Sequence, residues 1–213
     1  MGFGTIDNTR KTYVNIVGGK LAVSAKEGDL NAVSRKNKND KIVWEIYHPN
    51  LTGVITHINV QKNEKLGAWE YTIEVTDVID KYIVSVPADS KYGDNLACKV
   101  PNIKMNVETT ITPYDFEDKV EKNSAGKYRK HTGITFVQNG IKIPVAITKE
   151  NPQGRPEPGS DKMDEEEYKI YMIRVRKFYR ELVEKTAFDN ESKPKNTNNT
   201  EINSTTTDDD LPW

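Results

Sequence analysis

The chain has 213 residues with a formal net charge of −1, and 35% of its residues are hydrophobic. This composition supplies one hydrophobic core of ordinary size, so we expect a single compact domain with appended segments. No apolar run of membrane-spanning length and no basic segment followed by an apolar one occurs, which argues against a membrane helix or an export signal. The single cysteine, Cys98, excludes an intrachain disulfide and favours a reducing, cytoplasmic location.

The small net charge is the sum of two parts of opposite sign. From Phe188 to Trp213 the sequence has six acidic and two basic side chains, a local charge of −4. The preceding residues have 29 basic and 26 acidic side chains, a charge of +3. A basic body with an acidic tail often accompanies polyanion binding, although many other proteins share this pattern.

The residues from Lys11 to Ile147 are typical of a β protein. Strands are expected at 12–17, 20–25, 41–47, 51–60, 69–75, 81–87, 107–114, 133–138 and 140–147. Hairpin turns are expected at Gly18-Gly19 and Asn139-Gly140, and Gly53 predicts a bulge or bend in a long strand. A short helix is expected near 93–99. Many short strands with one small helix predict a closed or partly open β-barrel.

The composition changes at Thr148. Residues 148–163 are rich in proline and glycine, which is typical of a linker. Residues 164–187 have acidic side chains in the first turn and an apolar stripe, which predict an amphipathic helix packed on the body or on a second subunit. The stripe consists of Tyr168, Tyr171, Met172, Val175, Phe178, Tyr179, Leu182 and Val183. The tail, 188–213, is too polar to bury a core and is expected to be disordered.

Residues that would indicate catalysis are sparse. The three histidines, His48, His57 and His131, have no metal-ligand spacing, and neither a phosphate-binding glycine motif nor a nucleophile elbow occurs. We therefore expect a protein that is not an enzyme and has no metal or cofactor. A metal-dependent nuclease remains an alternative, based on acids that more often form a solvated strand face: Glu70, Glu74, Asp77 and Asp80.

Aromatic side chains are interleaved with basic ones in the body. Single-stranded nucleic acid exposes base faces and phosphates, so flat rings beside cations bind it without reading sequence. Residues 127–130 lie in a polar connection between strands, where barrel folds contact oligonucleotides. Trp44, Trp69 and Tyr71 share strand faces with isoleucine or valine, so the core is an alternative position for each ring. The predicted DNA-binding residues are Arg35, Lys36, Lys38, Trp44, Tyr47, Lys62, Lys65, Trp69, Tyr71, Tyr92, Lys127, Tyr128, Arg129 and Lys130.

The last six residues combine carboxylates with an apolar end, as a docking peptide does. They are Asp208, Asp209, Asp210, Leu211, Pro212 and Trp213. This DDDLPW sequence resembles the acidic tip of bacterial single-stranded DNA-binding proteins, with Leu211 in place of an isoleucine and Trp213 in place of a phenylalanine. The segments ITPYDFEDK and GITFVQNGIKI resemble the OB-fold single-stranded DNA-binding proteins of bacteriophages, a looser likeness that extends over about 51–147.

The resemblance implies an OB-fold β-barrel over 1–147 that binds single-stranded DNA during replication, recombination and repair. It also implies that the tip recruits proteins of these processes and competes with DNA for the basic groove. A phage-encoded protein would act in the host cytoplasm. The segments before Lys41 and after Lys162 depart from the bacterial body, so tetramer formation is not implied and a homo-oligomer remains open. The alternative is an OB-fold adaptor that binds only protein.

Overall fold

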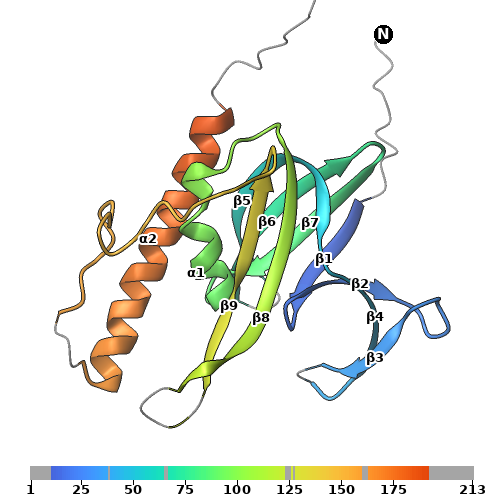
Figure 1. Ribbon diagram of the computed structural model, residues 1–213, viewed down its shortest axis with the longest axis horizontal. Helices are drawn as coiled ribbons and strands as arrows, with labels where there is room; N and C mark the ends of the chain where they lie inside the picture. Colours follow the sequence, from blue (N-terminus) through green and yellow to red (C-terminus); the bar gives the residue numbers. More distant parts are fainter. Residues whose placement is uncertain are drawn as a thin grey trace, which may run out of the picture.

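The computed structural model describes residues 11–37, 39–64, 67–122, 126, 128–159 and 163–191. Figure 1 shows a curled sheet with helices along one side. The strands are β1 (Lys11–Val17), β2 (Lys20–Ala25), β3 (Val33–Lys36), β4 (Ile42–His48), β5 (Leu51–Asn63), β6 (Ala68–Asp77), β7 (Asp80–Pro87), β8 (Glu108–Lys122), β9 (Tyr128–Gln138) and β10 (Ile141–Lys142). The helices are α1 (Lys91–Ala97), the 3-10 helix η1 (Val100–Asn102) and α2 (Glu165–Glu191).

The strands form one sheet in the order β10-β9-β8-β5-β6-β7-β1-β2-β4-β3. Neighbouring strands are antiparallel except β1 and β7, which are parallel. Strand β7 pairs with β6 along one edge and with β1 along the other. Neither edge of β7 is therefore available to pair with β9 and close the sheet into a barrel. The prediction of a mainly β body is confirmed, but the sheet is not closed into a barrel.

Two predicted hairpins are confirmed. The Gly18-Gly19 turn joins β1 to β2, and Asn139-Gly140 joins β9 to β10 with positive φ at both residues. Two other predictions are wrong in detail. The segment 33–36, interpreted as part of a polar loop, forms β3 at the edge of the sheet, and the last predicted strand is reduced to Ile141–Lys142 because the chain leaves the sheet before Pro144.

The long strand β5 changes partners along its length. Residues 51–54 pair with β8, whereas residues 54–63 pair with β6. The register shifts between Ile55 and His57, just beyond the predicted bend at Gly53. Gly53 itself lies against β6, where a Cβ atom would be 2.8 Å from the Thr76 carbonyl oxygen. Glycine therefore permits a close approach of the two backbones at the point where the strand begins to exchange neighbours.

The core lies between the curled sheet and the helices. In β6, the predicted alternation is confirmed for Tyr71, Ile73 and Val75, each of which is at most 1% exposed. Side chains of β7, β8 and β9 complete this face, including the fully buried Val84 and Phe136. Burial of these apolar side chains is the main favourable contribution to folding.

Helix α1 begins two residues before the predicted helix and is followed by η1. Its N-cap is Ser90, whose hydroxyl accepts a hydrogen bond from the Gly93 backbone N–H. Below it, the buried Lys99 ammonium donates to the Ile134 carbonyl oxygen and to Asn95 Oδ1. This lysine therefore joins the end of α1 to β9.

Helix α2 extends four residues beyond its predicted end at 187. Its predicted stripe packs on the protein's own body from Tyr171 onward, where Val175, Tyr179 and Val183 are buried against the core, but its first member, Tyr168, is 51% exposed. The segment before α2, predicted as a linker, also contacts it. Arg155 donates a hydrogen bond to the Tyr171 hydroxyl, 3.1 Å away, and lies over the Tyr179 ring.

Several predictions fall outside the described residues. They concern the segment 192–213, including the docking tip, together with Lys38, Lys65 and Lys127. In the part of the chain that is described, no helix has the combination of length and apolar character needed to cross a membrane.

Candidate nucleic-acid interface

The hairpin of β8 and β9 extends beyond the body of the protein (Figure 1). Its strands stay paired from Thr109 opposite Gln138 to Asp118 opposite Arg129, and after a register shift Lys122 pairs with Tyr128. The inner half contributes to the core. The outer half is exposed on both faces because no other described element covers it.

One face of this hairpin has a row of rings, which we call the aromatic row: Tyr114, Phe116 and His131. Phe116 pairs with His131 across the two strands, and their rings stack with centroids 5.3 Å apart and an interplanar angle of 18°. The Tyr114 ring centroid is 5.9 Å from that of Phe116. Phe116 remains 55% exposed, although large apolar side chains are usually buried. Within the row, the Phe116 ring is therefore exposed to solvent, whereas Tyr114 and His131 are half-buried.

Charged side chains of both signs flank the row, and on its own face the Asp118 carboxylate lies 3.8 Å from His131 Nε2. Arg129 is on the same face of β9 as His131, because residues two apart on a strand point to the same side. Lys130 points to the other side, where its ammonium lies 3.0 Å from Asp115 Oδ2, and this hydrogen bond raises the pKa of Lys130. Lys122 lies over the Tyr128 ring, 5.1 Å from its centroid. Positive charge is thus present on both faces of the hairpin.

An open groove of about 710 Å³ follows this part of the hairpin. Four cations and one acid line it, together with Gly126 and Tyr128: Lys91, Lys122, Arg129, Lys130 and Glu117. A second open groove, of about 350 Å³, shares three of these cations and adds Tyr114 and His131 from the aromatic row. The two grooves therefore adjoin. Together they extend from Lys122 in the outer half of the hairpin to Tyr114 and His131 of the aromatic row and to Lys91 at the start of α1.

The predicted site residues of β3 and β4 belong to a different part of the sheet. Arg35 forms a two-pronged ion pair with Glu45, with nitrogen to oxygen distances of 2.6 and 2.7 Å. The Tyr47 hydroxyl donates to the same carboxylate at 2.8 Å. The Arg35 hydrogen bond lowers the pKa of the buried Glu45. Arg35 and Tyr47 therefore stabilise a buried carboxylate, while Lys36 is exposed on the edge strand and Trp44 is half-buried.

The residues of β5 and β6 are divided between core and surface. Tyr71 is 1% exposed, so the prediction that its ring stacks on a base is wrong and its ring takes the alternative position in the core. Trp69 is partly buried against the core, and the Arg180 guanidinium of α2 lies over its ring. Lys62 is exposed beside Trp69 on the neighbouring strand. Tertiary packing, which strand alternation alone does not specify, decides these positions.

Tyr92 is a half-buried residue of α1. Its hydroxyl accepts a hydrogen bond from the Gly19 backbone N–H at 2.9 Å. Gly19 also approaches β8 closely, because a Cβ atom there would lie 2.6 Å from the Asp115 backbone nitrogen. Tyr92 therefore fixes the β1–β2 turn against the base of the hairpin, close to the proposed interface.

The aromatic row was not among the site residues predicted from the sequence. Tyr114 and Phe116 alternate within PYDFED, so their shared face was readable from strand periodicity, and His131 was considered only as a metal ligand. The acids of the nuclease alternative have other contacts: Glu70 accepts a hydrogen bond from Gln61, and Glu74 accepts one from Thr56. Across the described ranges, no group of three or more histidine, cysteine, aspartate or glutamate side chains is placed to hold a metal ion.

Neither a family model, nor a curated protein, nor a solved structure matches the chain. The arrangement of its own residues is consequently the basis for assigning a function. The strongest chemical feature in the described part of the body is the outer half of the β8–β9 hairpin, which has the exposed Phe116 in its aromatic row and lines a groove with four cations.

Proposed function

We propose that the protein binds single-stranded DNA without sequence preference, mainly through the β8–β9 hairpin. The observation that carries this proposal is the stack of the exposed Phe116 on the half-buried His131, on the same hairpin that lines the basic grooves. Unpaired bases have two exposed faces that stack on such rings, and each stacked base contributes about 1–3 kcal/mol. The phosphates that connect the bases would contact the four cations of the larger groove, Lys91, Lys122, Arg129 and Lys130.

We further propose that β5 to β9 is an OB-fold unit. In support, the strand order β9-β8-β5-β6-β7 places the β8–β9 hairpin on one side of the long strand β5 and the β6–β7 hairpin on the other. Along the sequence, α1 lies between β7 and β8. If β5 is the first strand, the β8–β9 connection is the loop between strands four and five. OB-folds bind oligonucleotides with this loop, with the loop after strand one, and with the face of strands two and three. The β1–β2 hairpin, paired beside β7, would be an addition that keeps the barrel open.

The docking role of Asp208, Asp209, Asp210, Leu211, Pro212 and Trp213 remains part of the proposal. It rests on the sequence of the tip and its resemblance to the bacterial tips. The acidic residues would meet a basic rim on a replication, recombination or repair protein, and the apolar residues would fill a pocket. The same carboxylates would compete with DNA for the basic grooves of the hairpin.

The test is a fluorescence anisotropy titration of a labelled thymidine oligomer with the full chain at low and high salt. We expect the affinity for the oligomer to fall as the salt concentration rises. A duplex of the same length should not show this binding. Phe116→Ala should weaken binding by roughly tenfold, the effect of one lost stacking contact. Val120→Ala is the matched control, because Val120 is 89% exposed on the same hairpin but has no ring.

Two results would contradict this function. Absence of binding by the wild-type chain at any salt would favour the adaptor that binds only protein. Equal affinities of the Phe116→Ala and wild-type proteins would remove the aromatic row from the interface. Thermal unfolding of both variants checks that the exposed substitutions leave the fold intact.

A further inference from the structure

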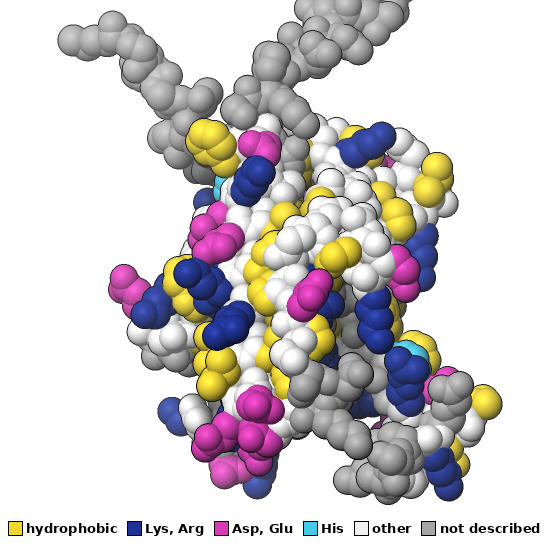
Figure 2. All heavy atoms as spheres, turned by 90° about the vertical axis from the view of Figure 1, so that its left-hand side faces the viewer, with side chains coloured by type: hydrophobic (Ala, Val, Ile, Leu, Met, Phe, Trp, Pro, Cys, Tyr) yellow, Lys and Arg dark blue, Asp and Glu magenta, His cyan; other side chains and the backbone are white. Residues whose placement is uncertain are grey.

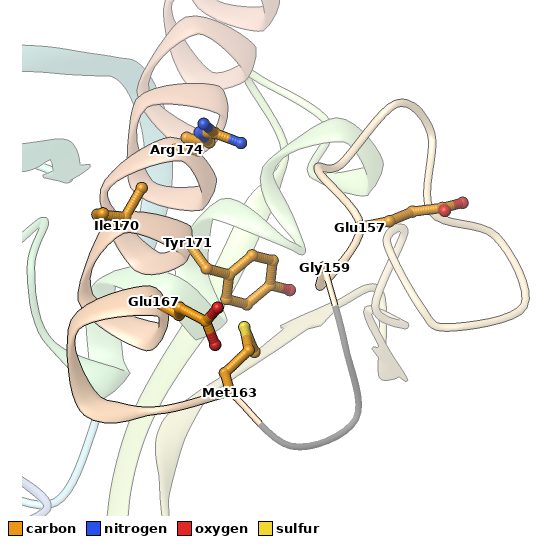
Figure 3. A pocket seen from close by; sticks show the side chains of 7 residues that line it. All are labelled: Glu157, Gly159, Met163, Glu167, Ile170, Tyr171 and Arg174. Carbon is orange, nitrogen blue, oxygen red and sulfur yellow. The ribbon is translucent and has the colours of Figure 1, made fainter.

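Helix α2 has a second apolar stripe on the side opposite its buried one. Ile170 and Ile173 are 54% and 66% exposed, whereas the buried stripe faces the body. Figure 3 shows Ile170 on the far side of α2 from Gly159, while Tyr171 points toward the preceding segment. Two neighbouring isoleucines on the outer side of a long helix are unusual, because surface helices normally present polar side chains there.

Charged residues flank the two isoleucines in a regular pattern. Glu166 lies four residues before Ile170, and Lys177 lies four residues after Ile173, with both charged side chains exposed. The spacing of four, three and four residues is that of the contact seam of two packed helices. We call the four residues Glu166, Ile170, Ile173 and Lys177 the outer seam. Figure 2 views the molecule from the side of α2, where hydrophobic and charged side chains are interspersed.

We propose that the outer seam pairs with the outer seam of a second copy of this chain, with the two helices antiparallel. The order acid, isoleucine, isoleucine, base is symmetric about its midpoint except for the sign of the charges. A twofold axis through that midpoint brings Ile170 against the partner's Ile173 and Glu166 against the partner's Lys177. Each contact then occurs twice, as an isologous interface requires.

The same charges exclude the parallel arrangement. In a parallel pair, Glu166 would face its own copy and Lys177 would face its own copy, and like charges opposite one another oppose pairing. The antiparallel arrangement replaces both repulsions by attractions. The seam therefore specifies both the partner and its direction.

A pocket beside the outer seam supports this choice. It has a volume of about 300 Å³ and is bordered by Glu167, Ile170, Tyr171 and Arg174 of α2 and by the segment that precedes the helix. Glu167 and Arg174 lie on the same flank of α2 (Figure 3). In the antiparallel pair this flank faces the same flank of the second copy, so Glu167 approaches the partner's Arg174. The charges of this flank thus agree with those of the outer seam in favouring a second copy as the occupant.

The interface is small. It buries four isoleucine side chains between two helices, which is at the low end of the size range of specific interfaces. We therefore expect a dimer that dissociates on dilution. The outer seam is separate from the β8–β9 hairpin, so the dimer is independent of the proposed DNA binding.

Sedimentation velocity of the nucleic-acid-free full chain over a concentration series tests the proposal. The wild-type chain should convert from monomer to dimer as concentration rises. The double change Ile170→Ser and Ile173→Ser should raise the dimer dissociation constant at least about tenfold. Phe188→Ser is the matched control, because Phe188 is 70% exposed on α2 but lies outside the paired stretch.

A charge exchange tests the direction of the helices. Glu166→Lys alone and Lys177→Glu alone should each weaken the dimer, because each places like charges opposite one another. An equimolar mixture of these two variants should form a heterodimer, in which every flanking pair is again of opposite sign. The double variant should also dimerise. Circular dichroism confirms that each variant keeps its helix.

Three outcomes would overturn the proposal. The first is a wild-type chain that stays monomeric at every concentration. The second is a dimer that the double serine change leaves unaltered. The third is a mixture of the two charge variants that associates no better than either variant alone.

Discussion

The Arg180 guanidinium carbon lies 5.2 Å from the centroid of the Trp69 ring. This contact connects the middle of α2 to β6, and Arg180 also approaches Asp89 on the loop before α1, with a nitrogen to oxygen distance of 3.9 Å. Trp69 was predicted to stack on DNA bases, yet this ring face is directed to the protein's own helix. Its fluorescence should therefore report the docking of α2.

We expect Arg180→Ala to destabilise the protein by about 1 kcal/mol, the usual magnitude of a partly buried cation–π contact. The change should also shift the emission of Trp69, measured with Trp44 and Trp213 replaced by phenylalanine. Urea unfolding followed by fluorescence gives both quantities. Lys185→Ala is the control, because Lys185 is exposed on the same helix. Equal effects of the two changes would show that the Trp69 contact has no energetic role.

The salt dependence of DNA binding should identify the cations that contact phosphates. Replacing both Arg129 and Lys130 by alanine should reduce the slope of log affinity against log salt by about 1.4, because each phosphate contact with single strands contributes about 0.7. The melting temperature should change little, since both side chains are exposed. The pair Lys169→Ala and Lys185→Ala removes the same charge from α2. An identical loss of slope in both pairs would indicate a general charge effect in place of a hairpin site.

Removal of residues 208–213 should increase DNA affinity at low salt and leave it nearly unchanged at high salt. The physical reason is that the three aspartates compete with phosphates for the same cations, and this competition is screened by added ions. Replacing the aspartates by asparagines, with Leu211 and Trp213 retained, should have the same effect. Anisotropy titrations at two salt concentrations measure it. An affinity that stays equal or falls after truncation would remove the competition from the proposed function.

Lys99 should make folding stability depend on alkaline pH. Burial lowers the pKa of Lys99 to about 8, from an ordinary value of 10.5. Between these two values the unfolded chain binds more protons than the folded one, so stability rises with pH by up to about 1.4 kcal/mol per pH unit. Below about pH 8 both states bind the proton, and this dependence ends.

The comparison of wild type with Lys99→Met isolates this effect from the other buried groups. Urea unfolding at several pH values between about 7.5 and about 10 measures the difference in unfolding free energy between the two proteins. This difference should change with pH above about pH 8 and be constant below it. The methionine also leaves the Ile134 carbonyl without its lysine donor, which lowers stability at every pH. A difference that is independent of pH throughout would show that Lys99 keeps its ordinary pKa.

Local pattern was sufficient for the elements whose signal is contained in a few neighbouring residues. The alternation from Trp69 to Val75 correctly predicted a strand with Tyr71, Ile73 and Val75 on one face. The Asn139-Gly140 pair predicted a hairpin because few other residues adopt its positive φ angles. The apolar spacing from Tyr171 to Val183 predicted the buried side of α2, because helical periodicity is a property of the chain itself.

The sequence by itself therefore determined which residues share a face, and only the tertiary structure decided which faces are covered. Tyr71 and Phe116 both alternate with polar neighbours, but Tyr71 lies under the helices and Phe116 lies on the exposed outer half of the β8–β9 hairpin. The same applies to Arg35. The sequence predicted a DNA-binding cation there, but the pairing of β3 with β4 places Arg35 beside Glu45, with which it forms an ion pair. The open sheet also follows from a contact distant in sequence, the parallel pairing of β1 with β7. Such contacts depend on the packing of the whole chain, which periodicity over a few residues does not encode.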